Sequence, residues 1–157
     1  MLQSIPTGAA PMQGRTFSLT FPSELRMLSV ARNFVDAICD AYRLDRTMTH
    51  ALVIVTGEAV TNIVRHAHQN RPDSQIEMHL HLLPDSAELT FIDQGAPFDL
   101  EAVPELPPGE LRIGGRGVYL MRTLMDELTC APRPSDGGGN ILRMVKRYTQ
   151  TDMRDCG

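Results

Sequence analysis

The stretch that decides how this chain is interpreted is Asp93-Gln94-Gly95-Ala96-Pro97-Phe98-Asp99, which directly follows a run rich in apolar residues. Two further motifs bracket it. Upstream, Glu58-Ala59-Val60-Thr61-Asn62 holds a carboxylate and a carboxamide four residues apart. Downstream, Gly114-Gly115-Arg116-Gly117 stands directly before an apolar helical run. Each motif alone is weak evidence, but their order predicts one ligand site assembled from three separate parts of the chain.

The bulk composition is that of an ordinary globular chain. With 157 residues, of which 42% are hydrophobic and 22% charged, it is long enough for one buried core and too short for two ordinary domains. The net charge is -4, and Lys and Arg form no run. We therefore predict a single domain whose partners include neither nucleic acid nor an anionic membrane surface.

The cysteines and the N-terminus bear on the cellular compartment. Cys39, Cys130 and Cys156 are odd in number and far apart, which favours neither a disulfide framework nor a zinc site. The N-terminus lacks a basic segment followed by an apolar one, and the apolar run 51–55 falls far short of the roughly 18 residues of a membrane span. These features predict a soluble protein of the reducing cytoplasm.

Hydrophobic periodicity predicts one domain at 15–148, between a loose arm at 1–14 and a tail at 149–157. Strands are expected at 16–21, 76–82, 87–93, 127–131 and 140–148. Helices are expected from an N-cap at Ser23 to about Tyr42, from 46 to 69, and from 117 to 128. The proline-rich segment 95–113 must be an irregular loop, and we expect its part 99–113 to be a mobile lid that orders around bound phosphates.

The second expected helix has two unlike faces. Its apolar residues spread over one wide face, whereas Glu58, Asn62 and Arg65 form a narrow stripe on the other. Apolar neighbours should partly desolvate Glu58, which favours proton acceptance near neutrality. The neutral oxygen of Asn62 suits Mg²⁺, and Arg65 is placed to meet a phosphate. The alternative is a solvated helix face with an ordinary polar pair.

The other two motifs suit a purine and its phosphates. Asp93 ends a strand, where its carboxylate can accept a hydrogen bond from the amino group of adenine, and Gly95 would leave room for the ring. The alternative is an ordinary turn out of the sheet. The segment 114–117 opens a helix whose free amides favour phosphate oxygens, although a short glycine motif is also typical of a hinge. Neither a P-loop nor a dinucleotide fingerprint is present.

Together, Glu58-x-x-x-Asn62, Asp93-x-Gly95-x-Pro97-Phe98-Asp99 and Gly115-x-Gly117-x-x-Leu120-Met121 resemble the N, G1 and G2 boxes of the GHKL ATPase superfamily. Within it, the match is best to the anti-sigma-factor serine kinases of bacterial partner-switching systems. The resemblance implies an α+β fold of the Bergerat type. This is a two-layer sandwich in which helices cover one face of a mixed, largely antiparallel sheet, with ATP and Mg²⁺ held between the helices and the lid.

The resemblance also implies residue roles. Glu58 would be the general base, Asn62 the Mg²⁺ ligand and Asp93 the adenine acceptor. The family often has Thr where this chain has Asn140, which can still form hydrogen bonds. The full expected set of nucleotide-binding residues is Asn62, Arg65, Asp93, Gly95, Pro97, Phe98, Gly114, Gly115, Arg116, Gly117, Val118 and Asn140.

The partners implied by the resemblance are two proteins. One is a STAS-domain anti-anti-sigma protein that is phosphorylated on serine or threonine, and the other is a sigma factor or another regulator that is sequestered. A homodimer stays open as an alternative to a monomer. Two other functions also stay open: an ATP-binding anti-sigma module without turnover, and a histidine-kinase ATPase domain, which would need a phosphoacceptor histidine on a preceding helical hairpin.

Overall fold

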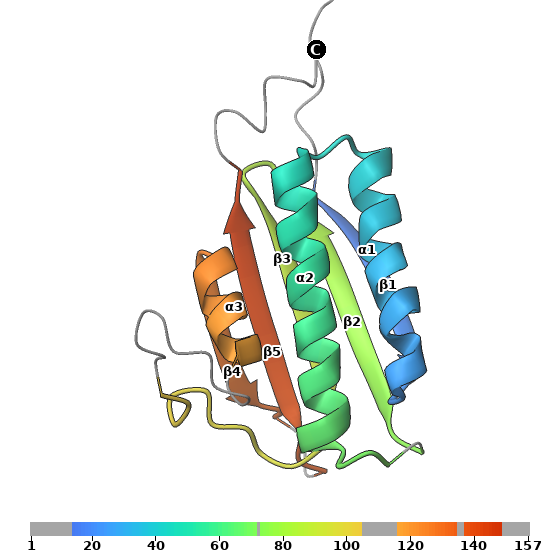
Figure 1. Cartoon of the computed structure of the whole chain (residues 1–157), viewed down its shortest axis with the longest axis vertical. Helices are drawn as coiled ribbons and strands as arrows, with labels where there is room; N and C mark the ends of the chain where they lie inside the picture. The colour runs from blue at the N-terminus through green and yellow to red at the C-terminus, as the bar shows by residue number, and fades with distance from the viewer. Residues whose placement is uncertain (1–13, 72, 105–115, 135–136, 149–157) are drawn as a thin grey trace, which may run out of the picture.

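The fold is a single antiparallel sheet covered on one face by helices. The computed structural model describes residues 14–71, 73–104, 116–134 and 137–148. The strands are β1 (Arg15–Pro22), β2 (Gln75–Leu82), β3 (Ser86–Asp93), β4 (Glu127–Pro132) and β5 (Asn140–Arg147), in the order β1-β2-β3-β5-β4. Figure 1 shows the helices α1 (Leu28–Ala41), α2 (Arg46–Asn62) and α3 (Arg116–Leu124) on one face of this sheet.

This architecture confirms the expected α+β sandwich, with one difference in detail. All four pairings between the described strands are antiparallel, so the expected mixed sheet has no parallel pair among them. The predicted hairpin of β2 and β3 is confirmed and is closed by a hydrogen bond from the Leu83 amide to the Ser86 carbonyl at 2.8 Å. The expected arm and tail lie outside the described residues except for Gly14, as does the lid beyond Pro104.

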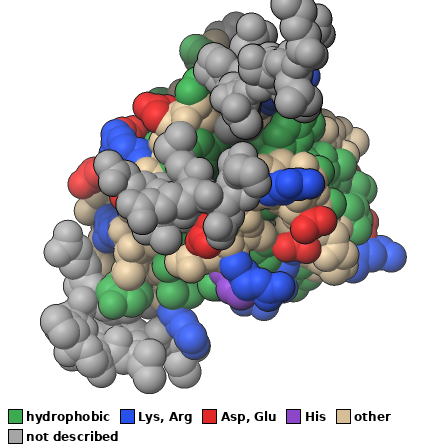
Figure 2. Space-filling view, turned by 90° about the horizontal axis from the view of Figure 1, so that it is seen from above, with side chains coloured by type: hydrophobic (Ala, Val, Ile, Leu, Met, Phe, Trp, Pro, Cys, Tyr) green, Lys and Arg blue, Asp and Glu red, His purple; other side chains and the backbone are tan. Residues whose placement is uncertain are grey.

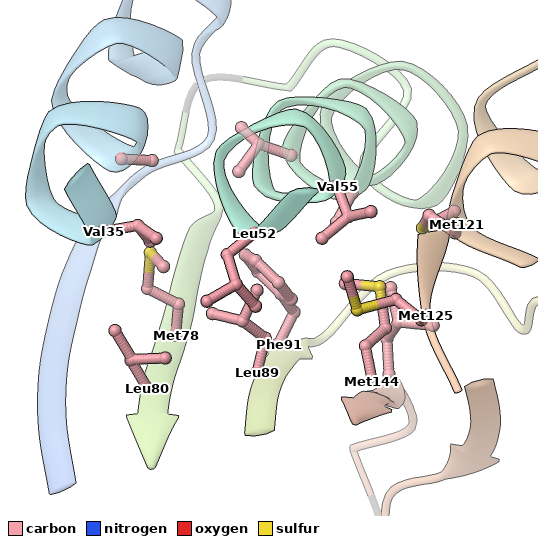
Figure 3. Packing of buried hydrophobic residues seen from close by; sticks show 14 of the residues in the cluster. Val35, Leu52, Val55, Met78, Leu80, Leu89, Phe91, Met121, Met125 and Met144 are labelled. Carbon is pink, nitrogen blue, oxygen red and sulfur yellow. The ribbon is translucent and has the colours of Figure 1, made fainter. Parts of the chain in front are cut away.

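The core fills the space between the sheet and the helices. Alternate residues of β2, beginning with Ile76 and Met78, are buried toward the helices. Leu52 and Val55 of α2 point down onto Leu89 and Phe91 of β3 (Figure 3). Full burial of such side chains stabilises the fold by about 1.5 to 3 kcal/mol each. The sheet and α2 therefore form a rigid base for the side chains at their common end.

Two helix boundaries differ from the expectation. Ser23 is not an N-cap, because the short 3-10 helix η1 (Leu25–Met27) precedes α1 and the Ser23 hydroxyl bonds to a histidine instead. The third helix ends at Leu124 instead of residue 128, because Glu127 already begins β4 and pairs with β5. In contrast, α2 begins as expected, with the Asp45 carboxylate accepting hydrogen bonds from the Thr47 and Met48 amides.

The helix α2 continues beyond Asn62 as a π-helix, η2 (Ile63–Ala67). The stretch Arg46–Ala67 has 22 residues and is long and apolar enough to cross a membrane by length and composition, but 61% of its most apolar window is buried inside the protein. Such burial is typical of the core helix of a globular domain. Figure 2, which looks onto the end of the molecule at the top of Figure 1, shows acidic and basic side chains interspersed among the described residues.

Candidate nucleotide-binding site

A pocket lies where the end of α2, the segment after β3, and the helix α3 meet the sheet. Its walls come from elements that are far apart in the sequence, and the predicted residues Asn62, Asp93, Pro97, Phe98 and Asn140 all lie in it. The complete lining is Ala59, Asn62, Ile63, His66, Ala67, Asp93, Ala96, Pro97, Phe98, Met121, Cys130, Asn140 and Leu142. A mostly apolar pocket with a few convergent polar groups is the usual form of a small-molecule site.

The first turn of α3 lies against the polar stripe of α2. Glu58 and Asn62 are both half-buried. A methyl group at Gly117 would lie 2.7 Å from Glu58 Oε2 and 3.3 Å from Asn62 Nδ2. The backbone at the start of a helix carries unpaired amides and the positive end of the helix dipole. The structure therefore brings a carboxylate, a carboxamide and the start of a helix together beside the pocket, which Asn62 also lines, and helix starts favour anions.

Asp93 is fixed by two hydrogen bonds to one of its oxygens. Its Oδ1 accepts from the Gly95 amide at 2.8 Å and from Asn140 Nδ2 at 3.1 Å. The side chain is 3% exposed and lines the pocket. Within the part of the chain that the structure describes, Oδ2 accepts no hydrogen bond. The protein therefore orients one oxygen of Asp93 and leaves the other without a donor among the described residues, and its use by a nucleotide stays a prediction.

Asn140 is used differently from the expectation. Its Nδ2 donates to Asp93 Oδ1 and also to the Ala96 carbonyl at 2.8 Å, while its Oδ1 accepts from the Phe98 amide at 2.9 Å. Both amide hydrogens are thus occupied within the protein. Asn140 lines the pocket, but its polar groups hold the Asp93–Phe98 segment and leave no hydrogen to donate to a purine.

Gly95 also has a different physical role from the one expected. A methyl group there would lie 2.7 Å from Ala67 Cβ and closer still to the Ala67 carbonyl. The same carbonyl accepts a hydrogen bond from the Ala96 amide at 2.9 Å. Gly95 therefore makes room for the end of η2 and not for an adenine ring, and its amide contributes by orienting Asp93.

The π-helix changes which side chain reaches the pocket. Arg65, expected near a phosphate, is exposed and does not line the pocket, whereas His66 does. The His68 amide bonds to the Ile63 carbonyl, five residues back, at 2.9 Å, so the turn is wider than the α-helical spacing used for the expectation. No residue pattern in the sequence marks this wider turn, so helical spacing assigned the position at the site to Arg65.

A buried hydrogen bond between Ser23 and His68 connects the residue after β1 with the residue after η2. His68 is 3% exposed, and its Nδ1 lies 2.7 Å from the hydroxyl oxygen of Ser23. Its Nε2 is buried with no hydrogen-bond partner among the described residues. Burial lowers the pKa of His68 below its ordinary value of 6.5; Asp93 opposes this shift, Arg71 adds to it and Asp73 opposes it. His68 is therefore a neutral structural residue next to the pocket.

The remaining predicted residues fall into three groups. Gly114 and Gly115 lie outside the described residues. Arg116 is exposed at the start of α3, and Val118, at 4% exposure, faces the core and does not line the pocket. Cys130, which had no expected role, lines the pocket, where burial and then Asp93 raise the pKa of its thiol and keep it protonated.

Comparison with known proteins gives the class to which this site belongs. Residues 21–146 match the histidine kinase-like ATPase domain family. The serine-protein kinase RsbW of Listeria innocua is 32% identical over 119 residues, which cover 71% of this chain and 76% of that protein. The serine-protein kinase RsbW of Halalkalibacterium halodurans is 29% identical over 151 residues, which cover 91% of this chain and 89% of that protein.

The chain belongs to the histidine kinase-like ATPase domain family. Within that family it is a serine-protein kinase of the RsbW type. A third relative, the RsbW serine-protein kinase of Oceanobacillus iheyensis, is 29% identical over 115 residues, which cover 68% of this chain and 73% of that protein. The matched range contains the whole pocket described above.

Proposed function

We propose that this kinase transfers the γ-phosphoryl group of ATP to a serine or threonine of a STAS-domain anti-anti-sigma protein in the cytoplasm, and that it sequesters a sigma factor or another regulator. The closeness of Glu58, Asn62 and the start of α3, beside a pocket that Asn62 lines, carries this proposal. The names of its relatives as serine-protein kinases support the type of acceptor. Once phosphorylated, the first partner dissociates and leaves the kinase free to hold the second.

The pocket suits the adenine ring of ATP, and the neighbouring start of α3 suits its phosphates. Asp93 Oδ2 accepts a hydrogen bond from the adenine amino group, and the apolar walls formed by residues such as Met121 and Leu142 take the ring. The triphosphate then extends toward Asn62 and Gly117, where the α3 backbone amides meet it. The two recognition elements are thus held by different strands and helices of one rigid core.

The residues present fit Mg²⁺ of the kind that accompanies a nucleotide. Asn62 would hold it through its side-chain oxygen, and Mg²⁺ bound in this way supplies charge neutralisation to the phosphates. Among the described residues, no group of three or more His, Cys, Asp or Glu side chains is placed to hold a metal alone. A single amide ligand suits an ion whose other positions are filled by waters and phosphate oxygens.

Glu58 is the proposed general base. Its half-buried carboxylate lies beside the start of α3, where the γ-phosphoryl group would be. It accepts the proton of the partner's hydroxyl as that oxygen bonds to the γ-phosphorus and the bond to the β,γ-bridging oxygen breaks, which releases ADP. A positioned base of this kind contributes roughly 10² to 10⁴ in rate.

Calorimetry with ATP and Mg²⁺ tests the proposed nucleotide site. Asn at position 93 can satisfy the Gly95 and Asn140 donors only with its oxygen in the place of Oδ1, so its NH₂ faces the pocket. The NH₂ then meets the adenine amino group, donor against donor, at a cost of about 1 to 3 kcal/mol. We therefore expect Asp93→Asn to bind ATP roughly 5- to 150-fold more weakly. Asp99→Asn, the same change at an exposed position of the same segment, is the control. Undiminished binding by Asp93→Asn would remove Asp93 as the adenine acceptor.

A further inference from the structure

We propose that Asn140 is a positioning residue that sets the selectivity of the site for adenine by holding Asp93 in one orientation. This inference rests on the proposed function and extends it. Asn140 and Asp93 are directly paired across β5 and β3. They are 4% and 3% exposed, so the contact between them is shielded from water. Cross-strand neighbours of this kind are close enough for their side chains to fix one another.

The three hydrogen bonds of Asn140 span the whole segment that follows β3. They reach the Asp93 carboxylate, the Ala96 carbonyl and the Phe98 amide, at 3.1, 2.8 and 2.9 Å. A carboxamide has two donor hydrogens and an acceptor oxygen, and all of these groups are used here. One side chain therefore fixes both the acceptor that faces the base and the backbone that forms the wall beside it.

The residue before Asn140 allows β5 to approach the end of β3 closely. Gly139 has a φ of +113°, a conformation that favours glycine. A methyl group at this residue would lie 2.9 Å from the Gln94 Cα and would overlap the Asp93 carbonyl. Gly139 thus lets β5 begin directly against the end of β3, which places the carboxamide of Asn140 over the carboxylate of Asp93.

Selectivity follows from which oxygen of Asp93 is free. With Oδ1 held by the Gly95 amide and Asn140 Nδ2, the other oxygen is presented to the base as an acceptor. Adenine carries an amino donor at its sixth position, whereas hypoxanthine carries a carbonyl oxygen there. Without Asn140, the Asp93 carboxylate can rotate and bind water. The free-energy cost of placing the carbonyl oxygen of hypoxanthine next to this carboxylate then becomes smaller.

The resembling family often has Thr where this chain has Asn140. A threonine hydroxyl has one hydrogen to donate and a shorter reach, so it cannot make all three of the hydrogen bonds seen here. Asn140→Thr should therefore keep a part of the function that Asn140→Ala removes. The Thr variant also places a β-branched residue, a type favoured in strands, at the start of β5, so we expect it to fold even if the Ala variant is unstable.

The test compares affinities for ATP and inosine triphosphate, which share sugar and phosphates, by calorimetry of the full chain with Mg²⁺. We expect Asn140→Ala to lower the ATP-to-inosine-triphosphate affinity ratio by about tenfold or more, and Asn140→Thr to give an intermediate ratio. In an Asp93→Ala background, Asn140→Ala should leave the ratio unchanged. An unaltered ratio in both single variants, whatever their melting temperatures, would overturn the inference.

Amide exchange in the nucleotide-free protein keeps this inference separate from the proposed function. The Phe98 amide should exchange slowly in the wild-type protein and much faster in Asn140→Ala, because its acceptor is removed. If the wild-type protein binds no ATP, the proposed function fails, and so does the selectivity role of Asn140. If ATP binds but Phe98 exchanges equally fast in both proteins, only the positioning role is overturned.

Discussion

Gly117, at the start of α3, lies so close to Glu58 of α2 that a methyl group added to it would be 2.7 Å from the Glu58 carboxylate. The same methyl group would lie 3.3 Å from Asn62 Nδ2. The backbone of α3 thus lies directly against the two side chains of α2 that we propose to be functional. Because α3 joins β4 within a few residues, this contact also connects the proposed catalytic side chains to the sheet edge.

Gly117→Ala should separate activity from stability. The added methyl group must displace the Glu58 carboxylate, and a misplacement of about 1 Å can lower a catalysed rate roughly 10²-fold. Alanine is also a better helix former than glycine by up to about 1 kcal/mol, so the melting temperature should stay the same or rise. Kinase assays and thermal unfolding of the same preparation measure both effects.

Gly137→Ala is the matched control for that change. A methyl group at Gly137 would have no atom of the described residues within 4 Å, and its backbone φ is not in the left-handed region. This variant should keep wild-type transfer. Full activity in Gly117→Ala, with the melting temperature unchanged, would show that the contact between α3 and Glu58 has no role in the reaction.

Gly95→Ala should instead lower stability. The methyl group would overlap the Ala67 backbone at the end of η2, which is part of the core and cannot move as a side chain can. Overpacking of this kind costs about 1 to 3 kcal/mol of unfolding free energy. Urea unfolding of the variant measures this cost, with Gly137→Ala again as the control. A variant as stable as the wild-type protein would mean that η2 can shift without loss.

The stability of the protein should depend on the protonation of His68. Because burial lowers its pKa below 6.5, the unfolded chain binds this proton more readily than the folded one. The unfolding free energy should therefore be level near neutrality and fall as the pH decreases from about 6.5 toward the lower folded-state pKa. Chemical unfolding at several pH values between about 7 and about 5 tests this dependence.

His68→Gln isolates this effect from the other titrating histidines. Glutamine can still bond to the Ser23 hydroxyl but does not ionise, so the variant should lose the part of the pH dependence due to His68. The wild-type and variant curves should converge as the pH falls. Parallel curves over the whole range would mean that His68 does not couple folding to protonation.

The fold was largely predictable because its elements have simple patterns. Alternation in β1, β2 and β3 predicted their positions to within about one residue, since one face of β2 and of β3 is buried and one face of β1 is at least partly buried. The end of α3 was not predictable in the same way. Leu128 continues the helical apolar spacing, but its pairing with Met144 in the sheet overrides that local preference.

Most of the residues at the site could be predicted from the sequence, but the contacts that they make could not. Helical periodicity placed Glu58 and Asn62 on one face of α2, and the order of the three motifs, together with the family resemblance, predicted that Gly117 lies in the same site. Residue spacing could not reveal that the missing side chain of Gly95 makes room for Ala67, or that the π-helix places His66 at the pocket. Both features depend on contacts between distant segments. A glycine has no side chain from which to infer what comes close to it.

The most direct test is phosphoryl transfer by the purified protein from γ-labelled ATP and Mg²⁺ to a panel of STAS-domain proteins from the same genome. We predict that one of these proteins is labelled on serine or threonine. In Glu58→Gln, calorimetry should give unchanged ATP binding while the transfer rate falls by roughly 10² to 10⁴. Transfer by Glu58→Gln at the wild-type rate, or ATP binding by the wild-type protein without label on any partner, would contradict the account.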